Sequence, residues 1–316
     1  VILSIGKREF SRIVTFSRDE QKKAALLKDF GWHPGFKVYA GDVRDPDRLI
    51  DIFHGCDVVV HGAARKVVTA DPDEPREMLL TNVLGTVNVM EAAKVAGVRK
   101  LLFISSDKAV HPCNAYGVSK ALAESLVVMG NARTHPQGLR MACLRYGNVI
   151  GSNGSVLRIW REQVRQGFPL SLSHPDMTRF WITLPQAVDA ILHAVDNLRG
   201  GDIFVPHIPA APVITLALAA CAEQRRDAVS AQQMFQEIGI RPGGEKLHEE
   251  LLSSPEVRRA KMQSGYYVIP PDVAADQRWE TAPWRGDLVA PELVYRSDVW
   301  PHRLDVEAMQ ALLETA

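Results

Sequence analysis

The sequence predicts an α/β protein built on a doubly wound parallel sheet. Short apolar runs rich in Val, Ile and Phe alternate with longer helical patterns through the first half of the chain. Crossovers of this length are right-handed and place helices on both faces of the sheet. The 316 residues leave room for two unequal domains. We therefore expect a Rossmann-like domain over residues 1–147, a smaller mixed α/β substrate domain mainly over 148–271 with some segments returning to the first domain, and a C-terminal extension over 272–316.

The predicted elements follow in chain order. The apolar runs predict strands at Arg12–Phe16, Phe36–Ala40, Asp57–His61, Lys100–Ser105 and Leu139–Arg145. The helical patterns between them cover Arg18–Lys28, Asp45–Phe53, Pro75–Ala96 and Asn114–Met129. After about Gly147 the rhythm changes to turns rich in Gly, Ser and Asn. Later elements are a helix near Leu184–Leu198, a strand near Gly201–Val205 and a final helix at Asp305–Leu313.

The N-terminal segment lacks the first strand and glycine-rich turn that open a dinucleotide-binding fold. Val1–Phe10 resembles the end of the helix that follows such a turn, so we expect a truncated chain whose true start lies upstream. In the usual order the absent strand lies between Arg12–Phe16 and Asp57–His61. These two strands should therefore border a slot without pairing with each other, and the chain should bind a dinucleotide poorly.

The composition argues against several classes of binding partner. The 37 Lys and Arg residues balance 37 Asp and Glu residues, which argues against binding to nucleic acid or to an anionic membrane surface. No apolar run approaches the roughly 20 residues needed to cross a bilayer. The four cysteines form no C-x-x-C pair and the histidines show no metal-site spacing, so we expect a reduced, cytoplasmic protein without a metal.

Residues after the first predicted strand favour a dinucleotide cofactor. An Arg at this position accommodates the extra phosphate of NADP, whereas NAD-binding folds place a carboxylate there. Ser17 and Arg18 therefore favour NADP over NAD. The alternative is a solvated helix start at which Asp19 and Glu20 face the helix dipole. Asp42 either accepts a hydrogen bond from the adenine amino group or caps a helix.

Tyr116 and Lys120 lie four residues apart, on one face at the start of a predicted helix. A tyrosine with a pKa of about 10 is a poor base at neutral pH. Lowering that pKa to about 7 requires about 4 kcal/mol, which an adjacent ammonium and a cationic nicotinamide can supply. The Tyr-x-x-x-Lys spacing alone is a weak signal. Its position strengthens it, because a predicted strand and the turn Ser106-Asp107-Lys108 closely precede it.

Several segments resemble the extended short-chain dehydrogenase/reductases that act on nucleotide sugars. These segments are Gly41–Asp45, Thr81–Thr86, Ser105–Lys108, Tyr116–Lys120 and Arg145–Val149. More narrowly, Asp107-Lys108, Met177–Trp181 and Arg241–Glu249 are similar to the UDP-N-acetylglucosamine 4,6-dehydratases (5-inverting) of polysaccharide and flagellin-glycan biosynthesis. The resemblance implies NADP-dependent dehydration of a UDP-N-acetylhexosamine to a 4-keto-6-deoxy sugar nucleotide, with inversion at carbon 5. We also expect a homo-oligomer.

The resemblance implies a catalytic role for each central residue. Tyr116 removes the carbon-4 hydroxyl proton while hydride passes to NADP, and Ser106 hydrogen-bonds the carbon-4 oxygen. Lys108 is the carbon-5 acid/base, and Asp107 assists the loss of water from carbon 6. Lys108 can be a base only if burial or a neighbouring cation lowers its pKa. The alternative for this pair is a surface Asp-Lys turn.

Binding roles follow from the same resemblance. The predicted cofactor site consists of Ser17, Arg18, Asp42, Val43, Ala63, Ala64, Lys66, Asn82, Tyr116 and Lys120. The predicted substrate site consists of Lys66, Asn148, Thr178, Arg179, Arg241 and Glu245. The two arginines are expected to converge on the substrate diphosphate. Asn82 is alternatively structural and Lys66 alternatively a solvated charge. Two departures, Asn153 and an extra Gly244, are expected to affect the register of the nucleotide pocket.

Two other functions stay open on the sequence. The first is a sugar-nucleotide 4-epimerase or a dehydratase of another sugar nucleotide. Asp107-Lys108 argues against the epimerase, because simple epimerisation needs no carbon-5 base. The second is a truncated, non-catalytic relative, which the absent glycine-rich turn supports.

Overall fold

The computed structural model describes residues 10–30, 35–66, 71–134, 138–152, 155–223, 235–241, 243–271 and 286–315. The expected helix end at Val1–Phe10, except Phe10 itself, and Asn153 lie outside these ranges. Within them, strands and helices alternate through the first half of the chain, and the strands at its centre are parallel. The predicted α/β, Rossmann-like fold class is confirmed.

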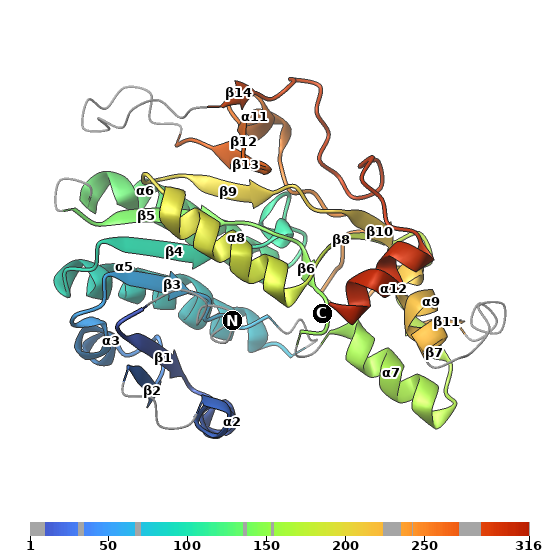
Figure 1. The fold of residues 1–316 in the computed structure, drawn as a ribbon, viewed down its shortest axis with the longest axis horizontal. Helices are drawn as coiled ribbons and strands as arrows, with labels where there is room; N and C mark the ends of the chain where they lie inside the picture. The colour runs from blue at the N-terminus through green and yellow to red at the C-terminus, as the bar shows by residue number, and fades with distance from the viewer. Residues whose placement is uncertain are drawn as a thin grey trace.

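The main sheet has seven strands in the order β14-β12-β13-β9-β5-β4-β3 (Figure 1). Its parallel part consists of β3 (Val58–His61), β4 (Lys100–Ile104), β5 (Arg140–Leu144) and β9 (Ile203–Pro206). Its antiparallel part consists of β13 (Tyr266–Ile269), β12 (Lys261–Gln263) and β14 (Asp287–Leu288). Segments late in the chain therefore return to the sheet that the first half begins.

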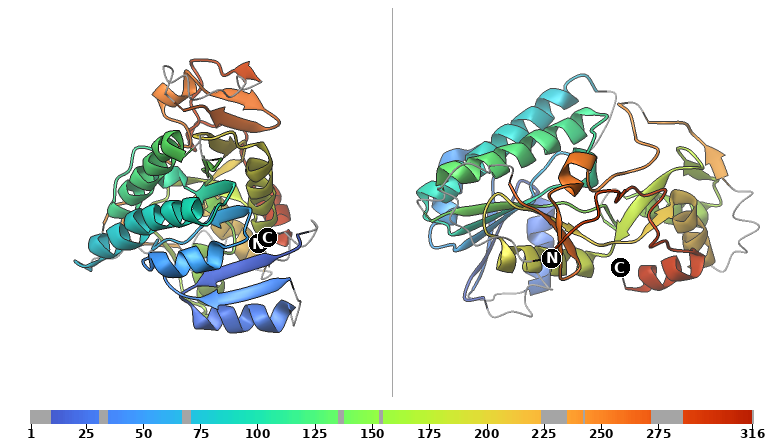
Figure 2. Two further views of the ribbon diagram at one scale, coloured as in Figure 1. Left: turned by 90° about the vertical axis from the view of Figure 1, so that its left-hand side faces the viewer. Right: turned by 90° about the horizontal axis from the view of Figure 1, so that it is seen from above.

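Helices cover both faces of this sheet (Figure 2). One face carries α5 (Gly85–Val95) and α6 (Ala115–Thr134), and the other carries α8 (Leu184–Asn197). The prediction of a single helix over Pro75–Ala96 was wrong in one respect. The structure divides it into α4 (Glu74–Met78), the π-helical segment η1 (Leu79–Leu84) and α5. Such wider turns often occur at functional sites, and this one carries the buried Asn82.

The first two strands stand apart from the main sheet. β1 (Ile13–Ser17) and β2 (Phe36–Ala40) form a parallel pair, followed by α2 (Glu20–Phe30) and α3 (Pro46–Phe53), respectively. Among the described residues, β1 pairs with β2, β3 pairs with β4, and no backbone pairing joins β1 to β3. Side chains of both strands line a pocket of about 700 Å³. Among the described residues, this pocket lies where the slot between the two strands was expected.

The second half also builds smaller sheets. β10 (Ala210–Pro212), β8 (Thr178–Ile182) and β6 (Asn148–Val149) form one sheet, and β7 (Leu170–Leu172) pairs with β11 (Phe235–Glu237) in another. The surrounding helices are α7 (Val156–Gln166), α9 (Val213–Glu223) and α12 (Val306–Glu314). They pack around a second apolar cluster that includes the fully buried Trp160.

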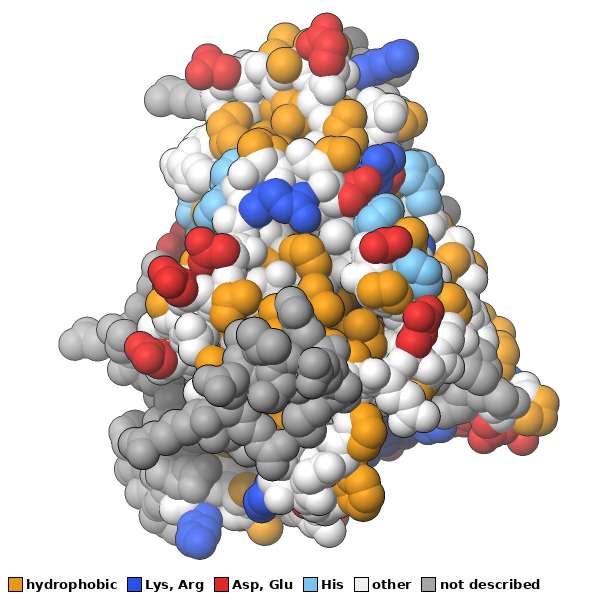
Figure 3. All heavy atoms as spheres, turned by 90° about the vertical axis from the view of Figure 1, so that its right-hand side faces the viewer, with side chains coloured by type: hydrophobic (Ala, Val, Ile, Leu, Met, Phe, Trp, Pro, Cys, Tyr) orange, Lys and Arg blue, Asp and Glu red, His pale blue; other side chains and the backbone are white. Residues whose placement is uncertain are grey.

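The surface carries charges of both signs. On the face seen in Figure 3, acidic, basic and histidine side chains are interspersed with hydrophobic ones. Among the described residues, no helix is long and apolar enough to cross a membrane. The same part of the chain contains no group of three or more His, Cys, Asp or Glu side chains that could hold a metal ion.

Candidate active site

The candidate active site lies beyond the carboxyl end of β4, where the 3-10 turn η2 (Asp107–Ala109) meets the start of α6. Ser106 caps this turn, because its Oγ accepts a hydrogen bond from the Lys108 backbone N–H at 3.3 Å. Gly117 lets α6 approach the turn closely, since a Cβ at that position would lie 2.5 Å from the Lys108 carbonyl oxygen. The helix thereby brings Tyr116 to the Asp107-Lys108 turn.

Asp107 and Lys108 form an ion pair inside the protein. Asp107 is fully buried, and its Oδ1 accepts hydrogen bonds from Ser106 Oγ at 2.8 Å and from Lys108 Nζ at 2.9 Å. Its Oδ2 is buried and has no hydrogen-bond partner among the described residues. Lys108 Nζ also donates to Asn148 Oδ1 at 3.0 Å. These contacts argue against the alternative of a surface Asp-Lys turn.

The ion pair keeps the Lys108 ammonium charged. Burial lowers the pKa of Lys108, but the carboxylates of Asp107 and Glu249 outweigh burial and raise it overall. A base at carbon 5 requires a lowered pKa, and the structure gives the opposite direction. Lys108 therefore needs a partner that takes its proton before it can act as a base.

The cation that acts on Tyr116 is Lys108. Burial raises the pKa of Tyr116, whereas the Lys108 charge and a hydrogen bond with Ser106 oppose that rise. The Asp107 carboxylate adds to the rise, and the pKa of Tyr116 is raised overall. The protein by itself therefore does not lower the pKa of this hydroxyl toward neutrality.

The described contacts of the Lys120 ammonium lie at the end of β4. Its Nζ donates a hydrogen bond to the Ile104 carbonyl oxygen and lies 4.0 Å from the centroid of the Phe103 ring. Burial lowers the pKa of Lys120 to about 8. The Lys120 ammonium is thus bound at the end of β4, and its expected action on Tyr116 stays a prediction.

The two predicted phosphate-binding arginines meet at one carboxylate. Glu245 Oε1 is paired with Arg241 Nη2 and lies 4.0 Å from Arg179 Nη2. Arg179 is 7 % exposed at its side chain and Arg241 is 63 % exposed, so the pair runs from the interior to the surface. The extra Gly244 is accommodated at a φ of 93°, and its carbonyl oxygen accepts a hydrogen bond from Asn114 Nδ2 at 2.8 Å.

Thr178 was predicted in the substrate site, but its hydroxyl already has partners. It lies 2.9 Å from His248 Nδ1 and 2.6 Å from Ser297 Oγ, and the side chain is buried. Its backbone carbonyl accepts a hydrogen bond from Arg179 Nη1 at 2.8 Å. In this structure Thr178 therefore supports Arg179.

Two charged residues that the sequence analysis did not assign to the site contact it directly. Glu249 Oε1 lies 3.4 Å from Lys108 Nζ, and Lys246 Nζ donates to the Asp107 carbonyl oxygen at 3.1 Å. Both belong to the segment Arg241–Glu249 that carries part of the family resemblance. Their i, i+3 spacing was the available signal, but it does not reveal a contact with a distant turn.

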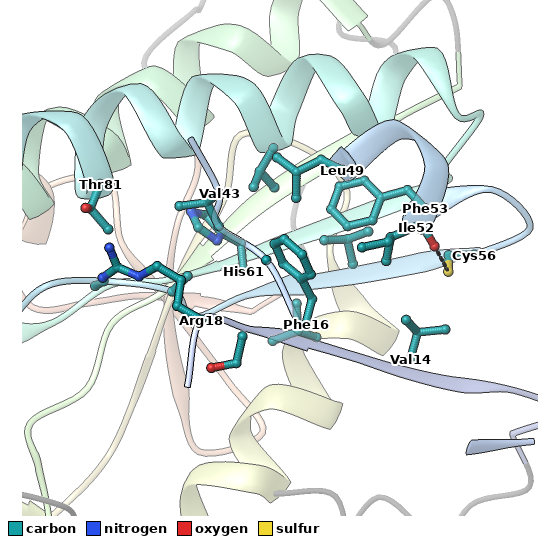
Figure 4. A pocket seen from close by; sticks show the side chains of 18 of the residues that line it. Val14, Phe16, Arg18, Val43, Leu49, Ile52, Phe53, Cys56, His61 and Thr81 are labelled. Atoms are coloured by element: carbon teal, nitrogen blue, oxygen red, sulfur yellow. Dashed lines mark hydrogen bonds between the residues drawn. The ribbon is translucent and has the colours of Figure 1, made fainter. Parts of the chain in front are cut away.

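Half of the predicted cofactor residues line the pocket between β1 and β3 (Figure 4). Ser17, Arg18, Val43, Ala63 and Ala64 line it. Its wall includes apolar side chains from β1, α3 and β3. Arg18, labelled in Figure 4, lies among these residues.

Arg18 of this pocket and the neighbouring Asp42 fit the adenosine end of a dinucleotide. Arg18 Nη1 donates to Asp42 Oδ2 at 3.2 Å, so a cation and an acceptor stand together where the ribose phosphate and the adenine amino group are expected. The small side chains of Ala63 and Ala64 follow β3, and exposed Lys66 comes two residues later. No glycine-rich phosphate turn before β1 is among the described residues.

Asn82 has the structural role that was one of its two alternatives. Its Oδ1 accepts from the Arg65 backbone N–H at 2.7 Å, and its Nδ2 donates to the Arg65 carbonyl oxygen at 2.9 Å. Nδ2 also donates to Ser119 Oγ at 2.8 Å. Asn82 thereby ties the segment after β3 to the first turns of α6.

Comparisons with known proteins agree with this architecture. A UDP-glucose 4-epimerase of Rickettsia typhi is 40 % identical over 265 residues, which are 84 % of this chain and 75 % of the relative. The UDP-glucose 4-epimerase of Rickettsia felis is 41 % identical with the same coverage. The X-ray structure of Pen from Bacillus thuringiensis has a TM-score of 0.88 at 28 % identity, covering 100 % of this chain and 93 % of that one.

More distant structures share the fold. DesIV, a dTDP-glucose 4,6-dehydratase of Streptomyces venezuelae solved with NAD, has a TM-score of 0.67 at 19 % identity, covering 77 % of this chain and 80 % of that one. The sequence profile of the family described as polysaccharide biosynthesis protein matches residues 1–271. The chain therefore belongs to the polysaccharide biosynthesis protein family, built on the fold of the extended short-chain dehydrogenase/reductases.

Proposed function

We propose that the protein uses NADP to convert a UDP-N-acetylhexosamine, expected to be UDP-N-acetylglucosamine, into a 4-keto-6-deoxy sugar nucleotide with inversion at carbon 5. The observation that carries the proposal is the ion pair between buried Asp107 and half-buried Lys108, beside Tyr116. The family match and the names of the relatives support a sugar nucleotide as the substrate and surface polysaccharide or glycan synthesis as the setting. A homo-oligomer in the cytoplasm completes the proposal.

Oxidation at carbon 4 depends on Tyr116. The cofactor, when bound, supplies hydride chemistry at carbon 4 and carbon 6. Tyr116 accepts the carbon-4 hydroxyl proton, and Ser106 hydrogen-bonds the same oxygen. Because burial raises the pKa of Tyr116, its anion has to be stabilised by nearby positive charge, and Lys108 provides that charge.

Elimination of water depends on one proton shared by Asp107 and Lys108. Their Oδ1 and Nζ atoms are 2.9 Å apart, and in the ion pair the proton is on Lys108. Its transfer to Asp107 creates a neutral amine and a neutral carboxylic acid. The amine then removes the carbon-5 proton and the acid protonates the departing carbon-6 hydroxyl, so the ion pair is restored when water leaves. A substrate that excludes water from the site favours this uncharged form.

A sugar-nucleotide 4-epimerase is the second candidate function. The two Rickettsia relatives carry this name. The raised pKa of Lys108 also suits an epimerase, because that reaction needs no base at carbon 5. The two candidates differ in whether the carbon-5 hydrogen exchanges with solvent.

We expect incubation with UDP-N-acetylglucosamine and NADP in deuterated water to give a 4-keto-6-deoxy product with deuterium at carbon 5. NMR spectroscopy of the product reads both the label and the carbon-5 configuration. Lys108→Met should remove the incorporation, because it deletes the proposed carbon-5 base. A 4-epimer that retains hydrogen at carbon 5 would instead establish the epimerase.

Arg18→Ala is expected to raise the Kd of NADP by about tenfold to a hundredfold, since a hydrogen bond to a charged group contributes about 1.5–3 kcal/mol. The Kd of NAD should change little, because NAD lacks the phosphate that Arg18 is proposed to meet. Calorimetric titration of both cofactors checks the difference, with Arg18→Lys as the charge-conserving control. Equal losses for both cofactors would remove Arg18 from this role.

A further inference from the structure

Glu249 lies among the cations of the candidate active site. Its side chain is 3 % exposed, and its carboxylate lies 2.6 Å from Lys246 Nζ, 3.4 Å from Lys108 Nζ and 3.9 Å from Arg179 Nε. Burial raises the pKa of Glu249, but these three cations outweigh it and lower the pKa to about 2. Glu249 is therefore an anion throughout the neutral pH range.

The backbone around Glu249 is fixed independently of its carboxylate. The Glu249 N–H donates to Ser297 Oγ at 2.9 Å, and the Ser297 N–H donates to the Glu249 carbonyl oxygen at 2.9 Å. Ser297 is fully buried. An amide in place of the carboxylate would keep these bonds and nearly the same volume, so the charge can be removed while the loop stays in place.

Lys246 connects the segment that carries Glu249 to the Asp107-Lys108 turn. Its Nζ donates to the carbonyl oxygens of Asp107 at 3.1 Å and Val110 at 2.9 Å. These carbonyls belong to the turn that carries Lys108. The pair formed by Lys246 and Glu249 therefore bridges the late segment of the chain to both the backbone and the ammonium of the Asp107-Lys108 turn.

We propose that Glu249 is a positioning residue that holds Lys108 Nζ in place and sets the pH range over which the Asp107–Lys108 pair keeps its shared proton. This inference rests on the proposed function for its catalytic meaning, although the contact itself does not. The charged and polar groups that face Lys108 from the surrounding elements are Asp107, Tyr116, Asn148, Arg179 and Glu249. Within this set, Asp107 and Glu249 are the two carboxylates that raise the Lys108 pKa.

Removing the Glu249 charge should change the pKa of Lys108 in one direction. The Lys108 ammonium loses one of its two stabilising anions, so its pKa falls. The pair then loses its shared proton at a lower pH, and the alkaline limb of the kcat/KM profile moves in the same direction. Looser placement of Nζ lowers kcat, and kcat is therefore expected to change more than KM.

The test compares Glu249→Gln with Glu250→Gln. Glu250 is the adjacent carboxylate, and its contact is with exposed His111 at 2.7 Å. NMR titration of ¹³Cε-labelled lysines reads the Lys108 pKa directly, with the resonance assigned by its loss in Lys108→Arg. For Glu249→Gln we expect the Lys108 pKa and the alkaline limb to fall by about one unit or more, and kcat to fall about tenfold or more. Glu250→Gln should match the parent protein.

Glu249→Asp supplies the charge-conserving control. It should return the Lys108 pKa toward the parent value, even if the shorter side chain does not restore kcat. A Glu249→Gln protein with an unchanged Lys108 pKa and pH profile, and only a lower melting temperature, would overturn the proposal. The NMR titration requires no turnover, so a different product in the deuterium experiment would contradict the proposed function without deciding the role of Glu249.

Discussion

Tyr116→Phe is expected to lower kcat by about 10²–10⁴-fold, the usual contribution of a general base in the reacting position. The substitution removes one hydroxyl and retains the ring, so the fold and the arginines proposed to hold the diphosphate should be unaffected. The Kd of UDP should therefore stay close to the parent value. Steady-state kinetics with calorimetric titration of UDP separates the two effects.

The matched control for this prediction is Tyr266→Phe. Tyr266 is a half-buried tyrosine of β13 that stacks on His193 at a ring-centroid distance of 3.9 Å, and it has no contact with the catalytic turn among the described interactions. Its variant should retain the activity of the parent protein. Tyr116→Phe with a kcat close to that of the parent would remove Tyr116 from the base role in both candidate reactions.

The central parallel strands β4 and β5 could be predicted because a strand buried on both faces is a short continuous apolar run. Phe36–Ala40 has the predicted bounds, and four further strands in the first half differ from prediction by one residue at one or both ends. The π-helical interruption at Leu79–Leu84 could not be predicted in the same way. It is associated with contacts of Asn82 to Arg65 and Ser119, which are distant in sequence.

Sequence patterns predict which residues form the candidate site, but not the contacts of their charged groups. Spacing places Tyr116 and Lys120 on one helical face, yet spacing does not say that the Lys120 ammonium binds the Ile104 carbonyl oxygen. Nor does a local pattern show that Lys108 is paired with Glu249. The direction of each pKa shift depends on burial and on contacts between distant segments. Together they determine which groups keep their protons.

Arg145→Met is expected to lower the free energy of unfolding by about 3–5 kcal/mol, because it leaves buried carboxylates without their cation. Arg145 is 2 % exposed and pairs with Glu124 of α6 and with Glu256 of the short helix α11 (Ser254–Val257). Its Nη1 also donates to the Leu251 carbonyl oxygen at 2.8 Å. The guanidinium thereby joins the helix of Tyr116 to the end of the loop that carries Glu249. Urea denaturation of the parent and the variant measures the change.

The same network predicts the direction of acid destabilisation. Burial raises the pKa of Glu256, but Arg145 outweighs burial and lowers it to about 2. The stability that this pairing supplies is complete above the unfolded-state pKa of about 4.3 and is lost as pH falls toward 2. Arg145→Met should therefore flatten the acid limb of the stability curve.

Arg165→Met is the matched control, since Arg165 pairs with Glu162 on the exposed face of α7 and should contribute at most about 1 kcal/mol. A loss no larger for Arg145→Met than for Arg165→Met would show that the buried network does not hold the two sides of the site together.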